Sequence, residues 1–161
     1  MPNHCDQQVN ISGPWAMVQE LYFNLSRGHD ARFCDAVTPM PLTKVADAYN
    51  WRWDNWGTKW DVCDVYLASD LTWYEDESTG DFDFTCWTAW GPPVPIWDKL
   101  FGLGVKVHAY YQDEGCMFEG KYIDGRNTSW DPSEIDIDTL DRLRDEDDFV
   151  SCLCRSYSHQ I

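Results

Sequence analysis

The chain has 161 residues, of which 43% are hydrophobic and 25% charged, and it carries a formal net charge of -16. This length suits one domain with its own core, and the composition excludes a disordered chain. The negative charge repels phosphate backbones and anionic membranes, so we expect neither direct nucleic-acid binding nor membrane association. Acidic surfaces also keep small proteins dispersed, so the charge alone does not identify a partner.

The first residues predict a cytoplasmic location. Residues 1–6 lack the basic start and apolar stretch of a secretory signal. No segment has the roughly 18 consecutive apolar residues of a membrane span. We therefore expect the seven cysteines to be reduced thiols.

The first half of the chain predicts a strand, a helix and then weaker structure. Residues 4–12 alternate as a strand does, and Pro14 opens a helix that runs to Leu25 and ends before Gly28. Residues 33–37 predict a short edge strand, which the prolines at 39 and 41 close. Residues 49–60 predict an aromatic loop.

The following segments alternate between strands and one helix. We expect strands over residues 61–71 and 81–88, a helix over 95–103, and a final hairpin of 106–112 with 117–124. Strands interrupted by two helices predict an α+β fold: a ferredoxin-like antiparallel sheet with helices on one face, spanning residues 1–125.

Residues 126–161 predict an acidic helical extension that packs on the same domain. Asp131 is the expected N-cap, with Pro132 in the first turn and Glu134 completing a capping box. The carboxylates of this extension are a candidate partner-binding surface: Asp131, Glu134, Asp136, Asp138, Asp141, Asp145, Glu146, Asp147 and Asp148.

Motifs for catalysis or for a cofactor are missing from the sequence. It has no Cys-x-x-Cys or His-x-x-x-His pair for zinc, no nucleophile elbow and no glycine-rich phosphate loop. We therefore predict no catalytic residues, no metal site and no cofactor. The alternative is a metal-dependent enzyme, in which Asp64, Asp83 and His108 would meet on the open face of the sheet.

A tryptophan-rich segment is the most distinctive local feature. Its candidate residues are either an interface anchor or a plug that closes one end of the core, with Arg52 and Lys59 over indole faces. We favour the plug. These residues are Trp51, Trp53, Trp56, Lys59 and Trp60.

Several short motifs, in this order, resemble the YubB-type ferredoxin-like family of phages and conjugative plasmids. They cover about residues 1–125: Pro2-Asn3-His4, Ile11-Ser12-Gly13, Pro39-Met40-Pro41, Asn55-Trp56-Gly57-Thr58-Lys59-Trp60-Asp61, Thr88-Ala89-Trp90-Gly91-Pro92-Pro93, Tyr110-Tyr111-Gln112-Asp113-Glu114-Gly115 and Phe118-Glu119-Gly120. Gly91 and Glu119 depart from the family pattern. The resemblance implies the fold and a mobile-element origin, and it implies no activity.

These observations favour a phage-encoded, non-catalytic protein that inhibits or redirects a host protein with a basic surface. In a sharper form of this hypothesis, the carboxylates of the protein mimic nucleic-acid phosphates. They would occupy the basic DNA- or RNA-binding site of a defence nuclease or RNA polymerase. Besides the enzyme, the remaining alternative is a structural or assembly protein whose contact is the tryptophan-rich segment.

Overall fold

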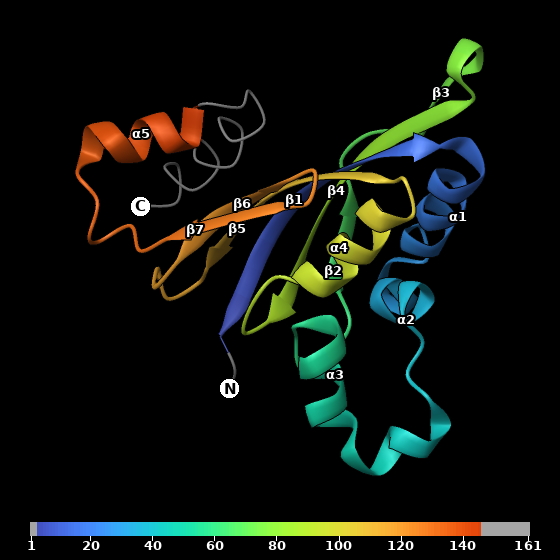
Figure 1. Ribbon diagram of the computed structural model, residues 1–161, viewed down its shortest axis with the longest axis horizontal. Coiled ribbons are helices and arrows are strands. Elements are labelled where there is room, and N and C mark those ends of the chain that lie inside the picture. The colour runs from blue at the N-terminus through green and yellow to red at the C-terminus, as the bar shows by residue number, and fades with distance from the viewer. Residues whose placement is uncertain (1–2, 146–161) are drawn as a thin grey trace.

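The chain folds as an α+β structure around one antiparallel sheet (Figure 1). The computed structural model describes residues 3–145. The seven strands follow the order β2-β4-β1-β5-β6-β7, and β3 pairs separately with β4. They are β1 (His4–Pro14), β2 (Cys63–Leu67), β3 (Thr72–Tyr74), β4 (Thr79–Ala89), β5 (Lys106–Asp113), β6 (Glu119–Ile123) and β7 (Arg126–Trp130).

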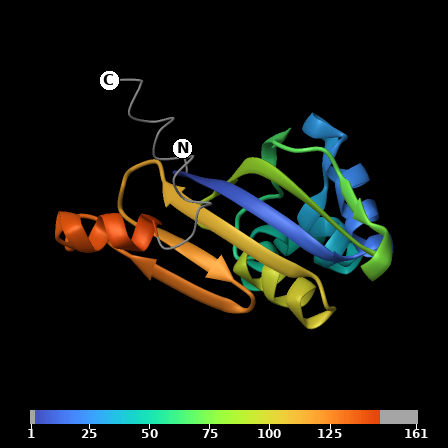
Figure 2. The ribbon, with the colours of Figure 1, turned by 90° about the horizontal axis from the view of Figure 1, so that it is seen from above.

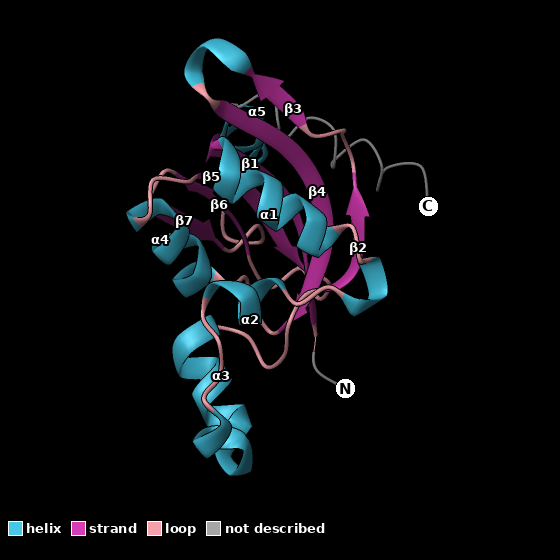
Figure 3. Cartoon of the chain, turned by 90° about the vertical axis from the view of Figure 1, so that its right-hand side faces the viewer, coloured by secondary structure: helices cyan, strands magenta, loops and turns pink. Residues whose placement is uncertain are grey.

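Most of the helices lie on one face of this sheet, and the last one lies over the other face (Figures 2 and 3). The α-helices are α1 (Trp15–Leu25), α2 (Phe33–Val37), α3 (Ala48–Trp56), α4 (Val94–Gly102) and α5 (Ile137–Asp145). Three 3-10 turns accompany them: η1 (Gly28–Asp30), η2 (Leu42–Asp47) and η3 (Glu75–Glu77).

The core lies between the central strands and helices α1, α2 and α4. Strand alternation sends every second side chain to the helices, so Val9 and Ile11 of β1 are fully buried with Phe82 and Phe84 of β4. Trp97 of α4 is also fully buried and closes the core beside β5 and β6. The predicted strands in these regions, and the helices predicted at 14–25 and 95–103, are confirmed.

Two predicted elements were wrong. Residues 33–37 form helix α2 instead of an edge strand, because the Asp61 carboxylate accepts hydrogen bonds from the amides of Cys34 at 2.9 Å and Asp35 at 3.0 Å. This carboxylate is an N-cap supplied from far along the chain. Residues 48–56 form helix α3, where a loop was predicted.

The C-terminal part also differs from the prediction. Strand β7 was missed, and it extends the sheet across the expected boundary after residue 125 by pairing with β6. Helix α5 begins at Ile137 instead of following Asp131. Its first turn is capped by Asp136, whose carboxylate accepts from the Thr139 amide at 2.9 Å.

Among residues 3–145, no helix has the length and apolar character required to cross a membrane.

Candidate functional site

The segment from Asn55 to Asp61 connects α3 to the sheet, and its residues have structural roles. Gly57 ends α3 with φ +74, and a Cβ at this position would lie 2.8 Å from the Pro95 ring. Thr58 is fully buried and donates to the Ala89 carbonyl at 2.9 Å. Asp61 caps α2. The string that carries the family resemblance thus fixes where α3 is attached.

Trp56 is the structural plug of this segment. It is 3% exposed, and its indole N–H donates to the Thr38 carbonyl at 2.8 Å. Trp51 meets it edge-on at 5.8 Å between ring centroids, and the Arg52 guanidinium lies 5.6 Å from its ring centroid. Trp56 therefore holds the C-terminal end of α3 against the core.

Lys59 lies among three aromatic rings. Its Nζ is 5.2 Å from the ring centroids of Trp60 and Trp90 and 5.8 Å from that of Tyr49. These distances fit cation–π attraction, so the predicted placement of Arg52 and Lys59 over aromatic faces is confirmed.

The outer side of this region is exposed and apolar. Helix α3 and the preceding turn η2 form an arm, residues 42–56, that projects away from the sheet (Figure 1). The exposed fractions are 90% for Leu42, 59% for Val45, 45% for Tyr49 and 46% for Trp53. We call these four residues the arm stripe. Trp53 meets Trp90 edge-on at 5.7 Å, which fixes its ring from behind.

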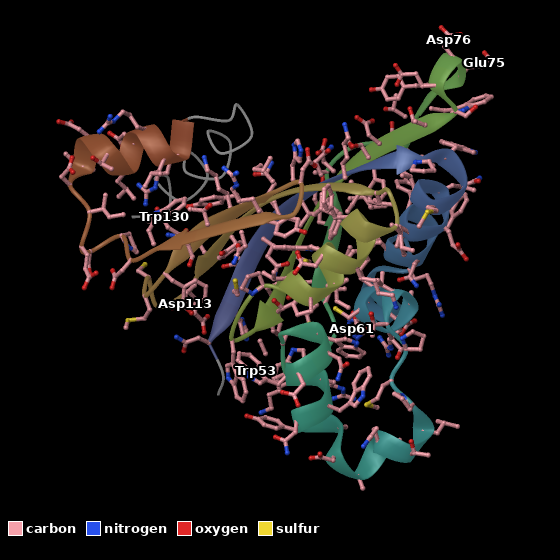
Figure 4. The ribbon with its side chains drawn as sticks, in the orientation of Figure 1. Trp53, Asp61, Glu75, Asp76, Asp113 and Trp130 are labelled. Atoms are coloured by element: carbon pink, nitrogen blue, oxygen red, sulfur yellow. The ribbon has the colours of Figure 1, made fainter. Side chains whose placement is uncertain are left out.

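A cavity of about 650 Å³ lies on another side of α3. Figure 4 shows Asp61, which lines this cavity, and Trp53 on opposite sides of the helix. The walls come from η1, α2, α3, the 60–62 connection, β2 and β4. They are His29, Arg32, Asp35, Met40, Arg52, Trp56, Trp60, Asp61, Val62, Cys63, Asp64 and Trp87.

Asp64, Asp83 and His108 have separate partners. Asp64 accepts from the Trp87 indole at 2.7 Å, Asp83 accepts from the Asn10 amide at 2.9 Å, and His108 lies 3.1 Å from Asp124. The strand register places Asp83 four residues from Trp87 on β4, about 13 Å along the strand. Within residues 3–145, no group of three His, Cys, Asp or Glu side chains could hold a metal ion.

The predicted acidic surface at the C-terminus is only partly described. Asp131 accepts from the Ser133 amide and hydroxyl, and Asp136 accepts at the start of α5. These hydrogen bonds lower the pKa of both carboxyls below the ordinary value. Glu134, Asp138 and Asp141 are exposed. The side chain of Asp145 and residues 146–148 lie outside the described part of the chain.

A buried carboxylate lies on the face of the sheet opposite to α1, α2 and α4. Sequence analysis did not identify it as a site. Glu119 is fully buried and forms an ion pair with Arg144 of α5 at 3.0 Å. It also accepts from Tyr110 at 3.0 Å, Trp130 at 2.7 Å and Gln112 at 3.4 Å. In the sequence, the only indication of this site was that Glu119 departs from the pattern of the family that the chain resembles. We call this set the Glu119 cluster.

The hairpin between β3 and β4 carries a separate cluster of negative charge. Glu75, Asp76 and Glu77 are all exposed at its tip, far from the arm (Figure 4). Asp81 raises the pKa of the nearby Tyr74 hydroxyl, because the carboxylate disfavours a second negative charge.

Comparison with known proteins returned no matching family model, no matching curated protein and no matching solved structure.

Proposed function

We propose that this protein is a non-catalytic binding protein of phage or plasmid origin that attaches to a host protein through the arm stripe. The observation that carries the proposal is the exposure of four large apolar side chains along one arm, with Leu42 90% exposed. Contiguous exposed apolar residues are typical of interaction sites, whereas single ones need no explanation.

The spacing and chemistry of the stripe support this role. Tyr49 and Trp53 stand four residues apart on α3, which is the spacing of one helical face, and Leu42 and Val45 lie in the preceding turn η2. Tyr and Trp are frequent anchors in protein interfaces because they bury much area with little loss of conformational freedom. A groove that accepts a helical apolar face would suit this surface.

The charge distribution supports a basic partner. Between Arg27 and Lys59 the chain has five Lys and Arg residues against four Asp, so the arm region is nearly neutral in a chain of net charge -16. A partner with a basic surface would be drawn in by the remaining acidic surface and would make its apolar contact at the arm.

The test is affinity capture from bacterial host cells with paired variants. Leu42→Ser/Tyr49→Ser removes two of the four residues of the arm stripe, and Phe23→Ser/Leu103→Ser removes two exposed apolar residues elsewhere, 56% and 53% exposed. We expect the first variant to lose a captured protein that wild type and the second variant retain. Equal capture by both variants would contradict the proposal.

Self-association is the competing use of the same surface, and it corresponds to the structural or assembly alternative. Light scattering distinguishes the two. A wild-type dimer that Leu42→Ser/Tyr49→Ser converts to a monomer would overturn the host-protein proposal.

Nucleic-acid mimicry remains a second candidate because of the acidic hairpin. Three consecutive carboxylates at an exposed tip can occupy a site that normally holds phosphates. This version predicts that affinity for the partner falls steeply with salt and that DNA or RNA competes. Glu75→Gln/Asp76→Asn/Glu77→Gln should then weaken binding more than the arm variant does.

We further infer a ferredoxin-like fold for the core. The strand order β2-β4-β1-β5, with α1 leading out of β1 and α4 linking β4 to β5, supports this inference. In that arrangement, the arm is an insertion between the first helix and the second strand.

A further inference from the structure

The cavity beside α3 has features of a small-molecule site. Its volume of about 650 Å³ falls in the ~300–1,000 Å³ range of ligand pockets. It is lined by the indoles of Trp56, Trp60 and Trp87, which provide flat apolar area, and by the guanidinium groups of Arg32 and Arg52. Neither the arm stripe nor the acidic hairpin contributes to it.

Two residues of the cavity wall each have a buried hydrogen-bond donor that lacks an acceptor. Of the residues that the structure describes, three have a buried side-chain nitrogen or oxygen atom without a hydrogen-bond partner: Gln8, Arg52 and Trp60. The atoms of the last two are Nε and Nε1, and both residues line the cavity. A buried donor without an acceptor costs about 1–3 kcal/mol, and more when the group is charged.

The thiol of Cys63 does not substitute for an acceptor. Burial raises the pKa of this thiol, and a weak interaction with the Trp60 indole N–H lowers it. Sulfur is a weak acceptor, and no contact between the two meets hydrogen-bond geometry.

The two arginines also lack carboxylate partners. Among the residues that the structure describes, neither Arg32 nor Arg52 forms an ion pair, whereas Arg144 pairs with Glu119 at 3.0 Å. The Arg32 guanidinium has one hydrogen bond, to the Ala31 carbonyl at 3.0 Å. In a chain with 28 acidic residues, two neighbouring arginines without such a partner are unexpected.

The three carboxylates of the wall each accept hydrogen bonds within the protein, and that of Asp35 accepts from the Met40 amide at 3.1 Å. Asp61 accepts from three backbone amides, those of Cys34, Asp35 and Val62, at 2.8–3.0 Å. Asp64 adopts φ +48 at an irregularity in the pairing of β2, and its carboxylate accepts from the Trp87 indole at 2.7 Å. These acids therefore have internal donors, so the groups left for a ligand are mainly donors.

We propose that this cavity binds a planar ring that carries an anionic group, either a phosphate or a carboxylate. The ring would lie against the indoles, and the anion would accept hydrogen bonds from Arg52 and Arg32. A guanidinium matches both anions, because its donors are arranged for two parallel hydrogen bonds. The acids of the distant hairpin have little influence here, since charges are screened beyond ~8 Å at physiological salt.

Titration calorimetry and tryptophan fluorescence test the proposal on the full chain. The probes are adenosine 5′-monophosphate, adenosine, inorganic phosphate and indole-3-carboxylate. We expect at least one ring-bearing anion to bind, and adenosine and phosphate to bind at least ten-fold more weakly than the better anion. The monophosphate and the carboxylate distinguish the two sources of the anionic group.

Paired variants identify the site. Arg52→Gln should weaken binding of the better probe about ten-fold, as loss of a charge-assisted hydrogen bond does. Lys44→Gln makes the same charge change on η2, away from the cavity, and should leave affinity unchanged. Thermal melting verifies that Arg52→Gln is folded.

Three results would overturn the proposal: no binding of any probe at millimolar concentration, an affinity for adenosine equal to that for the better anion, or equal losses in Arg52→Gln and Lys44→Gln. None of them bears on capture of a host protein by the arm stripe.

Discussion

Two polar clusters of this protein, one on the face of the sheet that α5 covers and one at the β2 edge of the sheet, differ in how completely their hydrogen bonds are made. The Glu119 carboxylate is fully buried and accepts from four side chains, including a charged guanidinium. In the cavity beside α3, Arg52 and Trp60 each have a buried donor without an acceptor. The first cluster contributes to stability, while the second leaves hydrogen-bonding capacity for a ligand.

The largest expected effect is the loss of the Glu119 carboxylate. Glu119→Ala removes the acceptor shared by Tyr110, Gln112, Trp130 and Arg144, and we expect the free energy of unfolding to fall by about 3 kcal/mol. Urea unfolding followed by circular dichroism measures this change. Glu119→Gln keeps an acceptor and the shape but removes the charge, so it should cost less than Glu119→Ala; wild-type stability of Glu119→Gln would contradict a role for the charge.

A smaller effect on stability is expected at Asp61, which lies in the cavity wall but whose carboxylate already accepts three hydrogen bonds. Asp61→Ala removes the cap of α2, and we expect a loss of about 1–2 kcal/mol in the same unfolding experiment. Asp61→Asn retains one acceptor oxygen and should recover part of the loss. A neutral Asp61→Ala would show that α2 does not depend on this carboxylate.

Acidification should loosen the start of α5, which carries Arg144 of the Glu119 cluster. The folded pKa of Asp136 lies below its ordinary value of 3.8, so this carboxylate stabilises the helix above that pH. The contribution is lost as the pH falls through the folded pKa. Amide exchange of Thr139, which donates to Asp136, should become less protected between about pH 5 and pH 3. Asp136→Asn cannot titrate and should abolish the dependence.

The smallest effect on stability is expected at the unsatisfied cluster. Arg52→Gln loses a cation–π contact with Trp56 but also removes a buried donor without an acceptor. These changes oppose each other, so we expect a net change in the free energy of unfolding of about 1 kcal/mol or less. A loss as large as that of Glu119→Ala would mean that the two clusters have the same role.

The sequence predicted the sheet and its two main helices because their patterns are local. Alternation along β1, β4 and β5, and the proline at the start of α1, depend only on neighbouring residues. Helices α2 and α3 depend on distant partners instead. Asp61 caps α2 from 26 residues away, and Trp56 of α3 bonds to Thr38.

Strand β7 and most of the cavity wall were also not predicted, because they too depend on contacts between residues far apart in the sequence. Strand β7 is mostly exposed and polar, so it has no apolar alternation, and its pairing with β6 places it in the sheet. The sequence placed Arg52 and Trp60 in one aromatic segment. The cavity around them also needs Arg32, Asp64 and Trp87, which come together only in the folded chain.

The way the arm is attached also determines which of its residues can change without loss of the fold. Trp56 and Thr38 are hydrogen-bonded to each other at the two ends of the segment, and no residue of η2 between them is buried. The fold therefore places few demands on residues 42–47. A segment held at its ends and unconstrained between them tolerates substitution, so residues 42–47 can change without disturbing the core.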